Sequence, residues 1–94
     1  MFSIKRAADG RVFLSGRLDA SQAEAAAVFL ARVTESCDVD LAELDYISSA
    51  GLGVLLGAQK RLRDSGHGLR LHGMSGHIRD LFRVSGLDQV FEIF

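Results

Sequence analysis

The sequence predicts an α/β fold: a mixed sheet of four to five strands with a hairpin at its N-terminal edge and its helices largely on one face. Three observations predict this fold. A hairpin pattern lies near residue 10, two strand–helix–strand units follow it, and the whole chain reads β-β-α-β-α-β-α-β. Strand–helix–strand units place their strands parallel through right-handed crossovers. The hairpin therefore supplies the antiparallel part of the sheet.

Length and composition restrict the class of protein. The chain has 94 residues, of which 48% are hydrophobic and 24% charged, and no proline or low-complexity stretch suggests a linker, so residues 1–94 are predicted to form a single domain. A net charge of −1 without a basic block argues against nucleic acid as a partner. No apolar run approaches the roughly 20 residues of a membrane span, which argues against direct membrane insertion. One cysteine, Cys37, and the lack of a signal-peptide pattern predict a cytoplasmic protein.

The first two strands alternate apolar and polar residues around the turn "ADGR". Phe2 and Ile4 precede the turn, and Val12 and Leu14 follow it. Asp-Gly between alternating segments is a strong hairpin signal. Gly16 is expected to end the second strand.

The stretch from 18 to 36, "LDASQAEAAAVFLARVTES", predicts the first helix. Asp19 or Ser21 can cap it, because Gln22 and Glu24 lie three residues further on and complete either version of a capping box. Its expected buried face comprises Ala23, Ala27, Leu30 and Val33, with Phe29 close to it. The next segment, "CDVDL" at 37–41, alternates as a short strand with one covered face.

The second helix is expected from 50 to 64, before a C-terminal turn at Gly66. Its predicted buried face comprises Leu52, Leu55, Leu56, Gln59 and Leu62. A fourth strand is predicted at 69–73 and a third helix at 75–86, capped by Ser75. The buried side of that helix is expected to hold Ile78, Leu81, Phe82 and Ser85. The end of the chain, "LDQVFEIF", predicts a turn and a short hydrophobic strand.

The stretch "ISSAGLG" at 47–53 carries the functional question. Ser49 lies where a strand is expected to meet the second helix, and its simplest interpretation is an N-cap. Gly51 and Gly53 cost a helix about 0.8–1 kcal/mol each relative to alanine, so either the backbone approaches something closely or the helix packs tightly on the sheet. Free N–H groups and the positive end of the helix dipole also make this a place where a phosphate can be bound or attached.

Enzymatic and metal-binding interpretations find little support. The stretch is not a Walker A loop, and Ile47 replaces the first glycine of a Gly-x-Ser-x-Gly nucleophile motif. His67, His72 and His77 are scattered, without carboxylate or cysteine partners at ligand spacing. They are expected in a turn, at an outward strand position and on the solvated side of a helix. The sequence thus predicts no catalytic residue, no cofactor and no metal site.

Three segments resemble the STAS domain family of bacterial anti-sigma-factor antagonists. They are "GRLDASQAEA", "DLAELDYISSAGLGVLLGAQKRL" and "LRLHGMSGHIRDLFRVSGLDQVFEIF", in the family's order from Gly16 to the end. The resemblance implies a STAS-like fold and binding to an anti-sigma factor that is a serine kinase with a histidine-kinase-like ATPase fold. It also implies phosphorylation of a Ser or Thr at the start of the second helix, reversed by a PP2C-type phosphatase.

The resemblance departs from the family at the acceptor itself. Phosphorylated members read Asp-Ser-Ser/Thr-Gly and accept phosphate just before the glycine, where this chain has Ala50, with Ser48 at the acidic position. Ser49, one position earlier, is therefore the leading phosphorylation candidate and Ser48 the second. Ala50 favours the alternative of a non-phosphorylated STAS adaptor, for example a subunit of a lipid-transport ABC complex. The predicted partner surface comprises Asp19, Ser48, Ser49, Gly51, Leu52 and Gly53.

The sequence ends with "FEIF", where many relatives continue into a final helix. Phe91, Ile93 and Phe94 are first interpreted as an ordinary buried last strand. A partner edge, or a weak homodimer through it, is the alternative.

Overall fold

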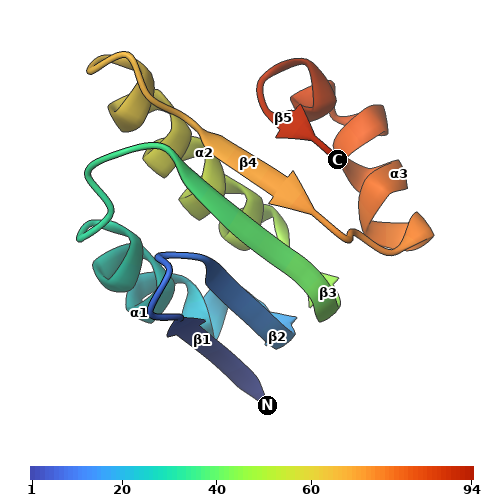
Figure 1. Ribbon diagram of the computed structural model, residues 1–94. Coiled ribbons are helices and arrows are strands. Elements are labelled where there is room, and N and C mark those ends of the chain that lie inside the picture. Colours follow the sequence, from blue (N-terminus) through green and yellow to red (C-terminus); the bar gives the residue numbers. More distant parts are fainter.

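Five strands form one mixed sheet in the order β1-β2-β3-β4-β5 (Figure 1). The computed structural model describes all 94 residues. The strands are β1 (Phe2–Arg6), β2 (Val12–Leu18), β3 (Cys37–Ile47), β4 (Leu69–His72) and β5 (Glu92–Ile93). Only β1 and β2 pair antiparallel, and the other neighbours are parallel. The predicted mixed α/β sheet with an N-terminal hairpin is confirmed.

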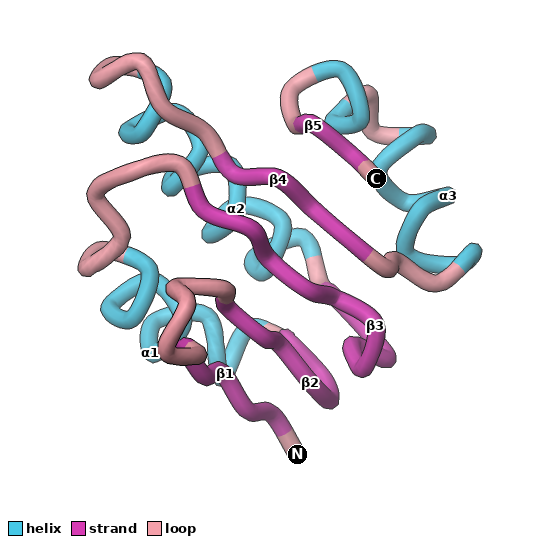
Figure 2. Tube along the Cα trace, in the orientation of Figure 1, coloured by secondary structure: helices cyan, strands magenta, loops and turns pink.

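Three α-helices and one short 3-10 helix connect the parallel strands (Figure 2). They are α1 (Ala20–Leu30), α2 (Ser49–Arg63), α3 (Gly76–Val84) and η1 (Leu87–Gln89). In Figure 1, α1 and α2 lie side by side behind the sheet, and α3 lies at its β4–β5 end. None of these helices is both long enough and apolar enough to cross a membrane.

The hairpin forms where the sequence predicts it, and its second strand runs further. Ile4 pairs with Leu14, and Gly10 has a φ of +92° in the turn. Gly16 does not end β2, which continues to Leu18. Gly16 instead adopts a φ of +83° at a register shift, where a Cβ atom would collide with the carbonyl oxygen of Met1.

Strand β3 is much longer than the predicted 37–41. The structure extends it to Ile47 because the second half pairs with the end of β2, Leu18 opposite Ile47. Two register shifts each add a residue to β3, and Ala42 and Glu43 are both exposed in succession. These bulges interrupt the alternation on which the sequence-based boundary depended.

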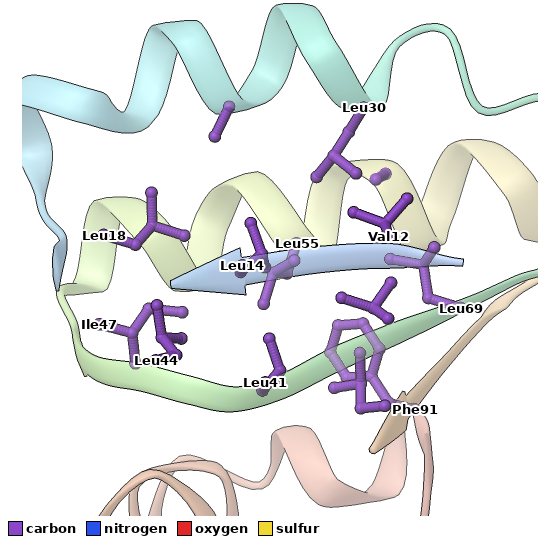
Figure 3. Packing of buried hydrophobic residues seen from close by; sticks show 14 of the residues in the cluster. Val12, Leu14, Leu18, Leu30, Leu41, Leu44, Ile47, Leu55, Leu69 and Phe91 are labelled. Atoms are coloured by element: carbon purple, nitrogen blue, oxygen red, sulfur yellow. The ribbon is translucent and has the colours of Figure 1, made fainter. Parts of the chain in front are cut away.

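One hydrophobic core of 20 residues lies between the sheet and the helices. In Figure 3, Leu14 of β2, Leu41 of β3 and Leu55 of α2 point into this space, and all three are at most 1% exposed. Phe82 of α3 and Phe91 belong to the same core and pack edge to face, with ring centroids 5.6 Å apart.

The buried helix faces match the predictions in part. Helix α1 buries Ala26 and Leu30, whereas the predicted Ala27 is exposed. The helix also ends at Leu30 rather than 36, and the Leu30 carbonyl accepts from the guanidinium of Arg61 and from the N–H of Val33. Helix α2 buries Gly51, Leu55, Ala58, Gln59 and Leu62, and leaves Leu52 and Leu56 half-buried. Helix α3 begins at its predicted cap Ser75 and buries Ile78 and Phe82, with Ser85 exposed.

Gln59 is the one polar side chain in the buried set. Its Nε2 donates to the Val90 carbonyl at 2.7 Å, and its Oε1 accepts from the Leu69 N–H at 2.7 Å. Both ends of the amide are therefore satisfied. The side chain ties α2 to β4 and to the C-terminal segment at the same time.

The last strand is short but covered. Phe91 is buried and Ile93 half-buried, which agrees with an ordinary last strand, whereas Phe94 is 60% exposed. The Phe94 ring stacks on His72 with centroids 4.8 Å apart. This ring therefore lies on the sheet face that α1 and α2 leave uncovered.

Candidate functional site

The predicted site residues meet at the carboxyl ends of β2 and β3. The two strands run parallel, and the Ser48 N–H donates to the Leu18 carbonyl at 2.9 Å. Asp19 directly follows the last residue of β2, and Ser48 directly follows the last residue of β3. The sheet thus brings together the start of α1 at Ala20 and the start of α2 at Ser49, which are far apart in sequence.

Ser48, not Ser49, caps α2. Ser48 has extended backbone angles, with φ −86° and ψ 172°, and its Oγ accepts from the Gly51 N–H at 3.1 Å. The interpretation of Ser49 as the N-cap is wrong by one residue. Ser49 is the first helical residue and is exposed, and none of the hydrogen bonds in the protein engages its hydroxyl.

The two phosphorylation candidates therefore differ in what their hydroxyl groups do. Ser48 is half-buried, and its hydroxyl oxygen is occupied by the cap. Ser49 presents a free hydroxyl to solvent beside the positive end of α2, and no acidic residue lies in the first turn of this helix. Of the two, only Ser49 offers a hydroxyl without a structural duty.

Asp19 caps α1. Its Oδ1 accepts from the Ser21 hydroxyl at 2.6 Å and from the Ser21 N–H at 3.0 Å. The Ser21 hydroxyl, more than any other group, lowers the pKa of the Asp19 carboxyl. The cap role weighed for Asp19 is thus present, with Asp19 rather than Ser21 at the cap position. It leaves the carboxylate ionised at the edge of the candidate surface.

The two glycines of the first turn differ in their surroundings. A Cβ atom on Gly51 would lie 2.8 Å from both the Leu18 carbonyl oxygen and Ile47 Cγ1, so no larger residue fits without a shift. Gly51 is buried, and it lets α2 approach the ends of β2 and β3. A Cβ atom on Gly53 would meet nothing within 4 Å. Gly53 is exposed, and packing inside the protein does not require it.

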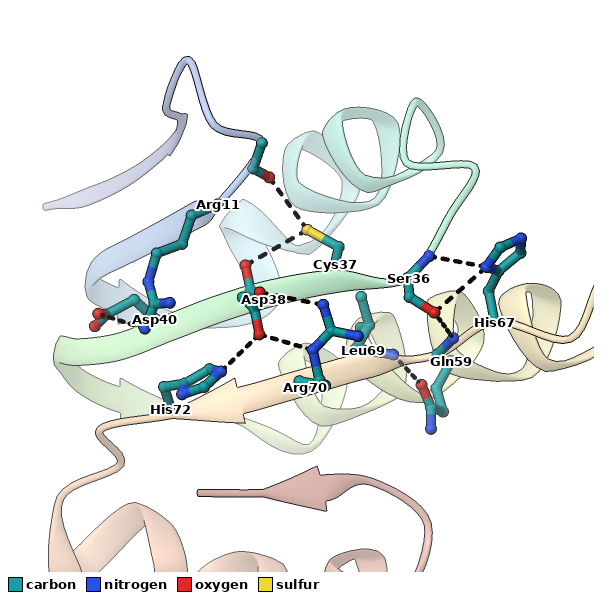
Figure 4. Close-up of polar contacts among 12 residues, drawn as sticks. Arg11, Ser36, Cys37, Asp38, Asp40, Gln59, His67, Leu69, Arg70 and His72 are labelled. Carbon is teal, nitrogen blue, oxygen red and sulfur yellow. Dashed lines mark hydrogen bonds and ion pairs between the residues drawn. The ribbon is translucent and has the colours of Figure 1, made fainter.

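A polar cluster on the uncovered sheet face was missed by the sequence analysis (Figure 4). Asp38 accepts from Arg70 at 2.8 and 3.1 Å, and His72 Nε2 lies 2.8 Å from the same carboxylate. These hydrogen bonds, that of Arg70 first, hold the pKa of Asp38 well below its usual range. The Asp38 carboxylate in turn raises the pKa of Arg70.

The histidines occupy the expected kinds of position, but one of them has a carboxylate partner. His67 lies in the turn after α2 and accepts from the Ser36 N–H, and His77 is exposed on α3. His72 points outward from β4, as predicted, and its Nε2 lies 2.8 Å from the carboxylate of Asp38, which is far from it in sequence. The signal was available only through the register, because Asp38 and His72 come from neighbouring parallel strands. No group of three or more His, Cys, Asp and Glu is arranged to hold a metal ion.

The fold is that of a small α/β domain whose candidate site lies at the start of α2, beside the Ser48 cap. The family model described as "Mlab, STAS domain" matches residues 3–93. The chain therefore belongs to the STAS domain family. Antagonists of this family are regulatory binding proteins and not enzymes, which agrees with the sequence-based prediction.

Individual proteins resemble this chain in sequence or in fold. The anti-sigma-B factor antagonist of Listeria monocytogenes is 37% identical over 86 residues, which cover 87% of this chain and 75% of that protein. An anti-sigma factor antagonist from Mycobacterium paratuberculosis has the same fold, with a TM-score of 0.83 at 20% identity over 100% of this chain and 84% of that one. The Bacillus cell fate determinant SpoIIAA, solved in its phosphorylated form, gives 0.73 at 20% identity over 100% and 91%.

Proposed function

We propose that this chain is a partner-switching regulator that binds an anti-sigma factor and is released from it when Ser49 is phosphorylated. The observation that carries the proposal is the free, exposed hydroxyl of Ser49 beside the Ser48 cap. The Listeria relative is named as an antagonist of an anti-sigma factor, and the anti-sigma factor antagonist SpoIIAA is known in an unphosphorylated and a phosphorylated form. The same chemistry fits this chain at Ser49. Such a regulator acts in the cytoplasm.

The switch follows from the charges at the start of α2. A phosphate adds about −1.5 to −2 charges, and the helix dipole stabilises it in place, so the backbone has little need to move. Ala50, Leu52 and Gly53 around it carry no charge, and the Asp19 carboxylate nearby is ionised. A partner seated on this surface would have to desolvate the new charge or leave.

The partner is expected to be a serine kinase with a histidine-kinase-like ATPase fold, and a PP2C-type phosphatase would restore the unmodified chain. The surface of this chain that contacts the kinase comprises the predicted residues Asp19, Ser48, Ser49, Leu52 and Gly53. Gly51 is buried against Leu18 and Ile47 and sets the position of the helix. Incubation with the purified kinase and ATP tests the proposal. We expect one phosphate by mass, which Ser49→Ala abolishes and Ser48→Ala does not.

A binding measurement distinguishes a phosphorylation that controls partner binding from one that leaves it unchanged. Ser49→Asp should weaken binding to the anti-sigma factor by about tenfold or more, about 1.4 kcal/mol, with an unchanged circular dichroism spectrum. The matched control is Ser65→Asp, an exposed serine in the turn after the far end of α2. Equal affinities of Ser49→Asp and the wild-type chain would remove this surface as the switch.

A second candidate function is a STAS adaptor that is never phosphorylated. It is favoured by Ala50, which is exposed at the position where phosphorylated relatives carry their acceptor. A pull-down distinguishes the two functions. Recovery of a histidine-kinase-like ATPase supports the switch, and recovery of an ABC ATPase with a permease supports the adaptor.

A further inference from the structure

A shallow apolar groove of about 400 Å³ runs between α1 and α2. Ala27 and Ala31 line it from α1, and Ala50, Gly53 and Gly57 line it from α2, with Arg61 at one end. From Ala50 to Arg61 the helix rises about 16 Å, at roughly 1.5 Å per residue. Because Ala50 follows Ser49 directly, the groove begins at the candidate phosphorylation site.

The glycines of the groove have no role inside the fold. A Cβ atom on Gly53 or on Gly57 would meet nothing within 4 Å, unlike one on Gly51. Glycine is the least favourable helix residue after proline, so alanine at either position would favour α2. The two positions instead keep a strip of backbone bare along the groove. A bare strip between two helices lets the ridge of a third helix approach closely.

Arg61 supplies the only charge on the lining of the groove. One guanidinium nitrogen donates to the Leu30 carbonyl at 2.9 Å, which holds the side chain across the end of α1. Arg61 makes no ion pair with any carboxylate of the chain. A guanidinium has five N–H donors, so most of them stay open to a carboxylate from outside.

We infer that the groove receives an amphipathic helix of the anti-sigma factor partner, with aliphatic side chains against the alanines and glycines and a carboxylate against Arg61. The inference rests on the proposed function and extends its contact surface along α2 from Ser49. The geometry gives the phosphate a second effect. A negative charge at Ser49 stands at the mouth of the groove that the acidic, apolar helix occupies.

Leucine in the groove tests the inference, with the anti-sigma-B factor of Listeria monocytogenes as the probe. Gly57→Leu should lower the affinity by about tenfold or more while raising the melting temperature of the chain, because it replaces a helical glycine. Gly53→Leu is the second groove variant, should Gly57→Leu disturb the packing of α1. Gly76→Leu is the matched control, since a Cβ atom there also meets nothing within 4 Å but lies at the start of α3. It should leave the affinity unchanged.

The charge is tested on the same helix. Arg61→Gln should weaken binding several-fold, whereas Arg63→Gln, whose side chain lines a different hollow, should not. Groove variants that fold and bind like the wild type overturn the inference, while weak binding by Ser49→Asp in the same series keeps the proposed function. A wild-type chain that does not bind the probe overturns both. If Gly57→Leu changes only self-association in sedimentation, the groove holds a second copy of the chain, and the inference is wrong.

Discussion

Replacing Ser48 and Ser49 one at a time by alanine should affect stability very differently, although the two serines are neighbours. The Ser48 hydroxyl accepts from the Gly51 N–H at 3.1 Å, and Gly51 is buried, so water replaces the lost bond poorly. Loss of an N-cap serine costs about 0.5–2 kcal/mol. Because this N–H is buried, we expect a value of about 1–2 kcal/mol for Ser48→Ala.

Ser49 has no such bond, and alanine is the best helix former, so Ser49→Ala should leave the free energy of unfolding unchanged or raise it by up to about 0.5 kcal/mol. In a chain of this length a change of 1 kcal/mol corresponds to about 4–8 °C in melting temperature. Urea unfolding followed by far-UV circular dichroism measures both variants. Ser75→Ala is the positive control, because the Ser75 hydroxyl caps α3 by accepting from the Ile78 N–H at 3.3 Å.

The outcome that refutes this assignment is a loss of stability in Ser49→Ala as large as that in Ser48→Ala. It would mean that Ser49 shares the cap, and that phosphorylating Ser49 perturbs the fold itself. The phosphate could then end binding by unfolding the start of α2, without any contact with a partner.

Three further predictions concern the surroundings of the site. Gly51→Ala should cost about 1–3 kcal/mol by overpacking against the Leu18 carbonyl. Gly53→Ala should instead stabilise the chain by up to about 1 kcal/mol in the same urea titration. Equal effects of the two substitutions would contradict the difference in packing between these glycines. Gln59→Leu should cost about 2–4 kcal/mol because it strands the Leu69 N–H and the Val90 carbonyl, and a cost below about 1 kcal/mol would show that neither bond matters. The pKa of Asp38 is lowered on folding, so its contribution to stability is complete above the unfolded pKa of about 4 and is lost as the pH falls below it. Acid unfolding should therefore be shallower in Asp38→Asn than in the wild type, and an identical pH profile would contradict the Asp38–Arg70 assignment.

The fold could be predicted where the signals are local. The Asp-Gly turn, the two crossover units and the Ser75 cap each depend on a few consecutive residues, and the structure places all of them as expected. The end of β3 could not be placed, because bulges between Asp40 and Glu43 and between Leu44 and Tyr46 break the alternation and arise from pairing with β2. The face of α1 was misassigned because alanines at 25, 26 and 27 give no contrast in hydrophobicity.

The N-cap of α2 was assigned one residue too late. The start of α2 was predicted at Ala50 rather than Ser49, which led to the choice of Ser49 instead of Ser48 as the cap, since a cap is defined by where the helix begins. The separate duties of Gly51 and Gly53 depend on what lies above each Cα, which a sequence does not contain. The Asp38–Arg70–His72 cluster likewise depends on the register between β3 and β4.

The most direct measurement is the affinity for the anti-sigma factor of homogeneous chain carrying one phosphate on Ser49, titrated beside the unmodified chain by calorimetry. Phosphorylated chain should bind at least about tenfold more weakly while its circular dichroism spectrum and melting profile stay those of the folded protein. Equal affinities of the two forms would contradict a switch at the start of α2.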